Sequence, residues 1–117
     1  MKIRVLGREY SVEIISGTTD TVYFQGDKIT VEHFEKQPNE LLREFLSDIL
    51  HDKIREILNQ IMSEGYIEIM GPIDIDIVDT IDNKPMRLAK IRKNKIKIKL
   101  STIILPVSIL RYIIAHE

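Results

Sequence analysis

The last two residues of the chain, His116 and Glu117, are the pair whose types and order could do chemistry. In zinc hydrolases two histidines one helical turn apart bind the metal, and the glutamate directly after the first polarises the metal-bound water. The metal lowers the pKa of that water, and the carboxylate then accepts its proton and passes it to the leaving amine. The order of the two residues predicts His116 as a zinc ligand and Glu117 as the general base.

The alternative interpretation of the same pair is an ordinary helix end, because the dipeptide His-Glu occurs by chance in many proteins. The zinc signature also requires a second histidine four residues after His116, which is a position beyond Glu117. We therefore expect this chain to be truncated within the motif, with the second histidine and a third ligand at later positions. A catalytic zinc needs three protein ligands, so the chain by itself should be inactive.

The residues that lead up to this pair carry a resemblance to a known family. The aliphatic run 103–105 is followed by Pro106, and six residues later comes Tyr112, then two isoleucines, one alanine and the His-Glu pair. This register resembles the entry into the active-site helix of the YgjP-like zinc metallopeptidases, which are relatives of the SprT and WLM-type gluzincins. The resemblance is close over residues 96–117 and loose over the rest of the chain.

That resemblance implies a zinc cofactor and a peptide or protein substrate. It also implies that the strand before the last helix forms the edge on which an extended substrate lies as an added strand. The substrate-binding residues would then be Lys95, Ile96, Lys97, Ile98 and Lys99. Lysines on an edge strand also block aggregation, which is the alternative interpretation. One family feature is absent, because Met86-Arg87-Leu88-Ala89 stands where many members have Trp-Gly-Ser-Cys.

The elements that must position these residues follow from hydrophobic periodicity. The first third predicts short antiparallel strands, with turns at Gly7 and at Gly26-Asp27. From about 38 to 64 the apolar residues recur every three or four positions, which predicts one long amphipathic helix. A last helix begins at about Pro106, a residue suited to a helix start. The layout indicates a single α+β domain over residues 1–117.

Between the two helices the pattern has a period of two residues. Isoleucines alternate with Asp74 and Asp76 in one stretch, and apolar residues alternate with Lys95, Lys97 and Lys99 in another. Each stretch should therefore have one buried face and one solvated face that carries these charges. We expect a second, hairpin-like pair of strands here, because opposite charges on neighbouring strands attract each other. Asn83-Lys84-Pro85 predicts a loop between them. The aspartates lack the glycine and closing glutamate of a calcium loop, so no metal is expected there.

The basic run from Lys90 to Lys99 supports a second hypothesis, in which the chain is a non-catalytic interaction domain that binds nucleic acid or protein through residues 90–99. No aromatic residue interrupts this run, so it offers no platform for base stacking. The formal net charge of -1 also gives no general attraction to nucleic acid. His33 and His51 are isolated and indicate no catalytic triad.

Composition limits the remaining classes. The chain has no cysteine, which excludes disulfides, thiolate nucleophiles and cysteine zinc sites. No apolar run is long enough for a signal peptide or a membrane span, so we expect a cytoplasmic protein with no membrane partner. Abundant Ile, Lys and Glu are typical of a thermophile source or of a source with an AT-rich genome. We also expect an incomplete last helix to expose Ile113 and Ile114, which would favour a homo-oligomer through that helix.

Overall fold

The computed structural model describes residues 1–65 and 72–116, and its mixed α+β architecture confirms the predicted fold class. The first four strands form one sheet in the order β1-β2-β4-β3. They are β1 (Lys2–Val5), β2 (Arg8–Ser16), β3 (Thr21–Gln25) and β4 (Lys28–His33). Each hairpin is antiparallel, as predicted, and turns at Gly7 or Gly26, where φ is 84° and 65°. The two hairpins join through a parallel pair, β2 with β4.

The long helix α1 spans Pro38–Ser63, which confirms the predicted helix of about 38 to 64. Pro38 lies in its first turn, and Gly65 follows its C-terminal end with a φ of 80°. One side of the helix is buried along nearly its whole length. Its buried residues are Leu41, Leu50, Ile54, Ile57, Leu58 and Ile61.

A second sheet has the strand order β5-β7-β6. Its strands are β5 (Asp74–Val78), β6 (Ala89–Arg92) and β7 (Lys95–Lys99). The predicted side-by-side pairing of the acidic and basic strands is confirmed, with Asp74 opposite Lys95 and Asp76 opposite Lys97. This pair is parallel, and the hairpin lies instead between β6 and β7, because the unpredicted strand β6 carries the chain back before β7 begins.

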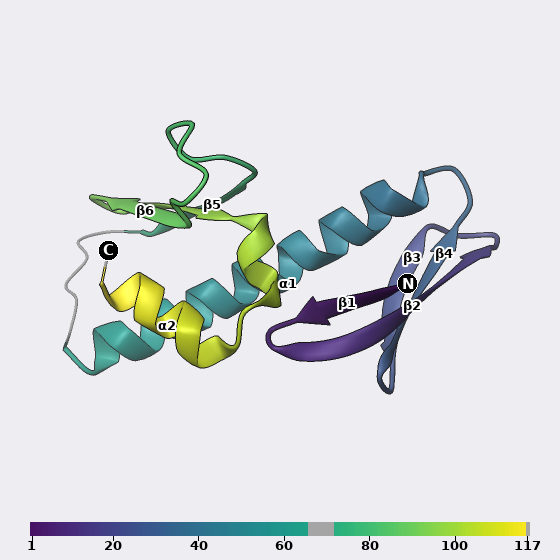
Figure 1. Cartoon of the computed structure of the whole chain (residues 1–117), viewed down its shortest axis with the longest axis horizontal. Helices are drawn as coiled ribbons and strands as arrows, with labels where there is room; N and C mark the ends of the chain where they lie inside the picture. The colour runs from purple at the N-terminus through teal and green to yellow at the C-terminus, as the bar shows by residue number, and fades with distance from the viewer. Residues whose placement is uncertain (66–71, 117) are drawn as a thin grey trace.

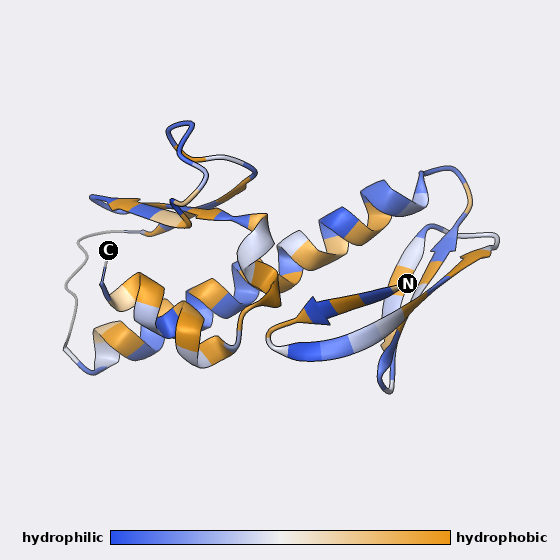
Figure 2. Cartoon of the chain, in the orientation of Figure 1, coloured by the Kyte–Doolittle hydropathy of each residue, from blue (hydrophilic) through white to orange (hydrophobic). Residues whose placement is uncertain are grey.

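After β7 the chain forms a short 3-10 helix, η1 (Leu100–Ile104), and then the last helix, α2 (Val107–Ala115). Pro106 immediately precedes α2, which confirms the predicted start at about residue 106. As Figure 1 shows, α1 runs diagonally between the two sheets, and α2 lies alongside its C-terminal half. Apolar side chains of both sheets, α1, η1 and α2 join in one core. Figure 2 shows that hydrophobic and hydrophilic residues alternate along the helices and strands that contribute to it.

The exposure of α2 differs from the prediction. Ile114 is fully buried and Ile113 is partly buried, so the expectation that both would be exposed is wrong. The reason is that α2 packs on α1 and β6, and its residues Leu110 and Ile114 belong to the main core. The large apolar residues that η1 and α2 do expose are Ile104, Val107, Ile109 and Tyr112. Among the helices that the structure describes, none combines the length and apolar character needed to cross a membrane.

Asp20 connects the start of the second hairpin to the segment after β4. Its Oδ1 accepts hydrogen bonds from the backbone N–H groups of Phe34 (2.7 Å), Glu35 (3.1 Å) and Lys36 (3.1 Å). These bonds, that from Phe34 above all, hold the pKa of the Asp20 carboxyl below its usual value of 3.8. The carboxylate thereby fixes the path from the N-terminal sheet to α1.

We expect the stability contributed by Asp20 to depend on pH. Because its pKa is lowered on folding, the contribution is complete above about pH 3.8 and is lost as the pH falls through the lowered pKa. The variant Asp20→Asn should therefore melt at a lower temperature than the wild type at pH 7, and the difference should shrink below pH 3.8. Thermal melting followed by circular dichroism measures this, with the exposed Asp52→Asn as control. A difference that is constant with pH would contradict the assignment.

Candidate functional site

His116, the predicted zinc ligand, directly follows the last residue of α2. Its backbone N–H donates to the carbonyl of Tyr112 at 3.2 Å, so it closes the last turn of the helix. Leu110 and Ile114 are fully buried and fix the helix against the core. The side chain of His116 itself is exposed. The fold thus holds an accessible imidazole at the end of a short, firmly packed helix.

The orientation of the His116 ring is determined by Tyr112, one helical turn earlier. The His116 ring stacks on the Tyr112 ring, with centroids 4.2 Å apart and planes 23° apart. The His116 Nδ1 lies 2.9 Å from the Tyr112 carbonyl oxygen. Since a carbonyl oxygen can only accept, Nδ1 carries the proton and donates it. In the neutral ring the other nitrogen, Nε2, then keeps its lone pair and can bind a metal or accept a proton.

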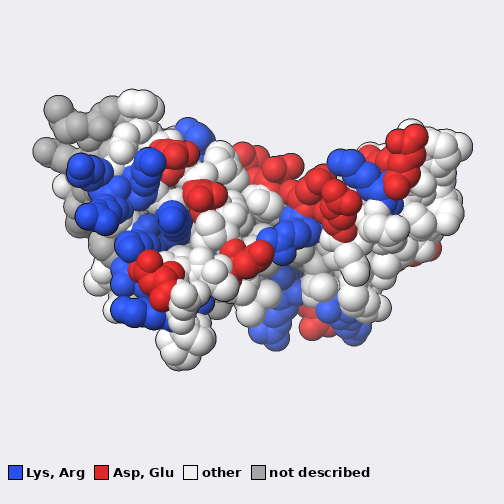
Figure 3. All heavy atoms as spheres, turned by 90° about the horizontal axis from the view of Figure 1, so that it is seen from above, with Lys and Arg blue, Asp and Glu red and all other residues white. Residues whose placement is uncertain are grey.

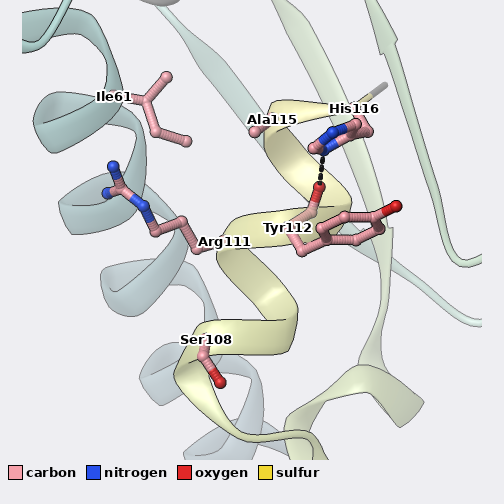
Figure 4. Close-up of a pocket in the computed structure, with 6 residues that line it drawn as sticks. All are labelled: Ile61, Ser108, Arg111, Tyr112, Ala115 and His116. Carbon is pink, nitrogen blue, oxygen red and sulfur yellow. Dashed lines mark hydrogen bonds between the residues drawn. The ribbon is translucent and has the colours of Figure 1, made fainter.

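A cavity of 560 Å³ lies beside this imidazole, between α2 and the C-terminal part of α1. Its lining residues are Ile61, Ser108, Arg111, Tyr112, Ala115 and His116. Figure 4 shows that Arg111 points toward α1, whereas Tyr112 and His116 lie together on the other side of α2. The Arg111 guanidinium pairs with Glu64 and lies 3.5 Å from the Gln60 side-chain oxygen. Arg111 therefore ties α2 to α1 and closes one side of the cavity.

Glu117, the predicted general base, lies outside the described residues, so its role stays a prediction. His116 supplies one potential metal ligand. Within residues 1–65 and 72–116, no group of three or more His, Asp and Glu side chains is arranged to hold a metal ion. Two of the aspartates after β5 are instead in ion pairs, Asp79 with Arg43 and Asp82 with Lys90.

The predicted substrate edge is wrong in its position. β7 lies in the middle of the second sheet, with β5 on one side and β6 on the other, so its backbone is paired on both sides. Strand addition needs an unpaired backbone edge, which β7 does not offer. The prediction failed because β6 was not recognised as a strand. A role of residues 95–99 in substrate binding stays a prediction for their side chains only.

Those side chains divide between the two faces of the sheet. Ile96 and Ile98 are buried in the core, and Lys95 and Lys97 are exposed on the opposite face. The two lysines therefore do not share the cavity of His116. Lys99, which the sequence placed on the solvated face, is only 7% exposed. Its Nζ donates to the carbonyl oxygens of Lys84 (3.2 Å) and Pro85 (2.8 Å), because the loop before β6 folds over it.

Two features of the site were not predicted from the sequence. The stacking of Tyr112 on His116 could have been, since side chains four residues apart in a helix are neighbours. The pairing of Arg111 with Glu64 had no local signal, because the two residues are 47 positions apart and meet only when α2 packs on α1. Comparisons with protein-family models, curated proteins and solved structures find no match for this chain.

Proposed function

We propose that this chain is the N-terminal part of a zinc-dependent metallohydrolase, a peptidase that cleaves peptide bonds with metal-activated water. In this proposal His116 is the first zinc ligand and Glu117 the general base. The observation that carries it is the hydrogen bond from His116 Nδ1 to the Tyr112 carbonyl, which leaves Nε2 as the free nitrogen of an exposed ring beside a 560 Å³ cavity. The resemblance of residues 96–117 to YgjP-like metallopeptidases supports the same assignment.

The described residues fit one ligand position of such a site. Metal-binding histidines commonly donate their second ring N–H to a carbonyl or carboxylate, which fixes the tautomer and the orientation of the ring. His116 makes such a bond. The described residues do not by themselves complete a zinc site, so the proposal includes a second histidine at position 120 and a further ligand after it. When bound, zinc would supply a water of lowered pKa.

The residues around His116 each have a defined role in this proposal. The Tyr112 carbonyl holds the Nδ1 proton of His116, and the Tyr112 ring limits rotation of the imidazole through stacking. Leu110 and Ile114 anchor the helix. Arg111, through its pair with Glu64, keeps the helix end at a fixed distance from α1. Peptide substrate would enter through the cavity beside His116, and not by strand addition to β7.

The proposal is tested on the complete product of the gene, purified without added metal. We expect about one zinc per chain by metal analysis, and replacement of His116 by alanine should abolish it, because a catalytic zinc rarely survives the loss of one of three ligands. The variant Glu117→Gln should keep its zinc and lose peptide hydrolysis by about 100-fold or more.

The matched control is His51→Ala, a histidine on the half-exposed side of α1, which should keep both zinc and activity. Equal zinc in the wild type and the His116→Ala variant would disprove the assignment. A complete gene product with no further ligand after Glu117 would do the same.

A further inference from the structure

The outer face of the second sheet carries its charges in two rows that cross the strands. The rows are Asp74, Lys95 and Arg92 in one, and Asp76, Lys97 and Lys90 in the next. Residues paired across strands share a face of the sheet, so these six side chains lie on the side away from the core. In both rows the acidic side chain comes from β5. The charged side chains that β7 and β6 contribute to this face, which we call the basic columns, are all lysine or arginine.

The basic columns surround a hollow of 470 Å³ at the turn between β6 and β7. Its lining residues are Lys90, Arg92, Lys93, Asn94, Lys95 and Lys97. We call the five cationic residues of this set the basic face. Figure 3 shows lysine and arginine side chains gathered at this end of the molecule. Among the residues that the structure describes, no acidic, aromatic or aliphatic one lines the hollow.

Most of these charges have no partner within the part of the chain that the structure describes. Lys90 pairs with Asp82 at 2.9 Å, and this contact lowers the pKa of the Asp82 carboxyl. Arg92, Lys93, Lys95 and Lys97 form no ion pair with any described residue. Asp74 and Asp76 lie beside the lysines of β7 but leave β6 and the turn without a counter-charge. Four adjacent cations therefore face solvent.

The turn between β6 and β7 places one of these cations at an unfavourable backbone conformation. Lys93 has a φ of 57°, in the left-handed region where glycine and asparagine are more favourable. A lysine at this position adds a cation to the basic face at some cost in backbone energy. The neighbouring Asn94 uses its side-chain amide to donate to the carbonyl of Pro72 at 2.8 Å, which ties the turn down.

The spacing of the basic face suits a ligand with regularly repeated negative charges. Lys95 and Lys97 are two residues apart on one strand, which separates their positions by about 6.7 Å. Arg92 and Lys90 stand directly across from them, at about 5 Å between Cβ atoms. A single phosphate would reach only part of this grid, whereas a phosphodiester chain would cover it. None of the described residues that line the hollow is aromatic, so none of them offers bases a ring to stack on.

From this arrangement we propose that the basic face binds the phosphate backbone of a nucleic acid without sequence preference. The contacts would come from Arg92, Lys93, Lys95 and Lys97, and the acidic column of β5 would confine the strand to the β6 side. This site lies on the opposite side of the second sheet from His116, and the inference does not depend on the zinc proposal.

Binding is measured by fluorescence anisotropy with a labelled single-stranded RNA of mixed sequence. Four phosphate contacts predict a slope of log K against log salt of about -2.8, which is roughly a 50-fold loss of affinity between about 50 and 200 mM salt. The double variant Lys95→Gln with Lys97→Gln should bind roughly tenfold more weakly and halve the slope to about -1.4.

The matched control is the double variant Lys2→Gln with Lys36→Gln, which changes the net charge equally at exposed lysines of the N-terminal half. It should change affinity less than twofold, and circular dichroism should show both double variants folded at the temperature of the binding assay. An equal loss in the two double variants would overturn the proposal, and so would binding that ignores salt. Competition by polyglutamate as strong as that by unlabelled RNA would assign the face to acidic polypeptides instead.

Discussion

Replacing Ile114 by alanine should lower the free energy of unfolding by about 2–4 kcal/mol. The Ile114 side chain is fully buried in the main core, so the substitution removes apolar contacts and leaves a cavity. The helix that carries it has only nine residues, too few to be stable without tertiary packing. Urea unfolding followed by circular dichroism measures the loss.

The control for this prediction is Ile109→Ala, the same change on the same helix at a side chain that is 44% exposed. It should cost about 0.5 kcal/mol or less, since little contact is lost. Equal losses in the two variants would mean that α2 is not packed as the structure shows. Amide exchange should also become faster along α2 in Ile114→Ala and stay unchanged in Ile109→Ala.

The second large effect is expected at Gly7, in the turn between β1 and β2. Gly7 has a φ of 84°, and a Cβ there would lie 3.1 Å from the Cα of Pro106, the residue that precedes α2. The backbone N–H of the preceding Leu6 donates to the Ile103 carbonyl at 2.5 Å, so the turn is held against η1. We expect Gly7→Ala to cost about 2–3 kcal/mol, from left-handed strain and from this close approach to backbone.

Gly26→Ala is the matched control, because Gly26 also has a positive φ, of 65°, but a Cβ there would meet no atom within 4 Å. That variant should show the strain alone, about 1–2 kcal/mol. The difference between the two losses, measured by urea unfolding, isolates the contact between the first turn and Pro106. No difference would mean that the turn does not pack on the start of α2.

Much of the fold could be predicted because periodicity reports burial directly. The three-to-four spacing of α1 gave its bounds to within a residue, since the side of the helix that faces both sheets must be apolar. The pairing of β5 with β7 followed from their opposite charges. The parallel direction of this pair and the place of β6 beside β7 could not be predicted, because alternation defines the two faces of a strand but not which strand lies beside it.

The strand β6 was missed for a related reason. It has only four residues, Ala89–Arg92, and it forms a strand by pairing with β7. Missing it led to one error, the placing of β7 at an edge. The unforeseen path of the loop at Lys84 and Pro85 led to another, the placing of Lys99 on the solvated face. Both depend on where the chain between β5 and β7 lies, which no local pattern of residues reports.

The candidate site was predicted in part. The place of His116 at the end of a helix that starts after Pro106 followed from residues 103–116. The cavity and the pairing of Arg111 with Glu64 depend on how α2 packs on α1, which is a tertiary property. The direction of the His116 ring depends on its hydrogen bond to the Tyr112 carbonyl, and the sequence alone does not define this bond.

The position of α1 between the two sheets has a consequence for cooperativity. This one helix packs against β3 and β4 of the N-terminal half and against β5, η1 and α2 of the C-terminal half. If either half unfolded, the apolar side chains of α1 that it covers would become exposed to water, and α1 would be a less stable support for the other half. The two halves should therefore unfold together. A substitution that stabilises the N-terminal sheet should also stabilise α2 and so the position of His116.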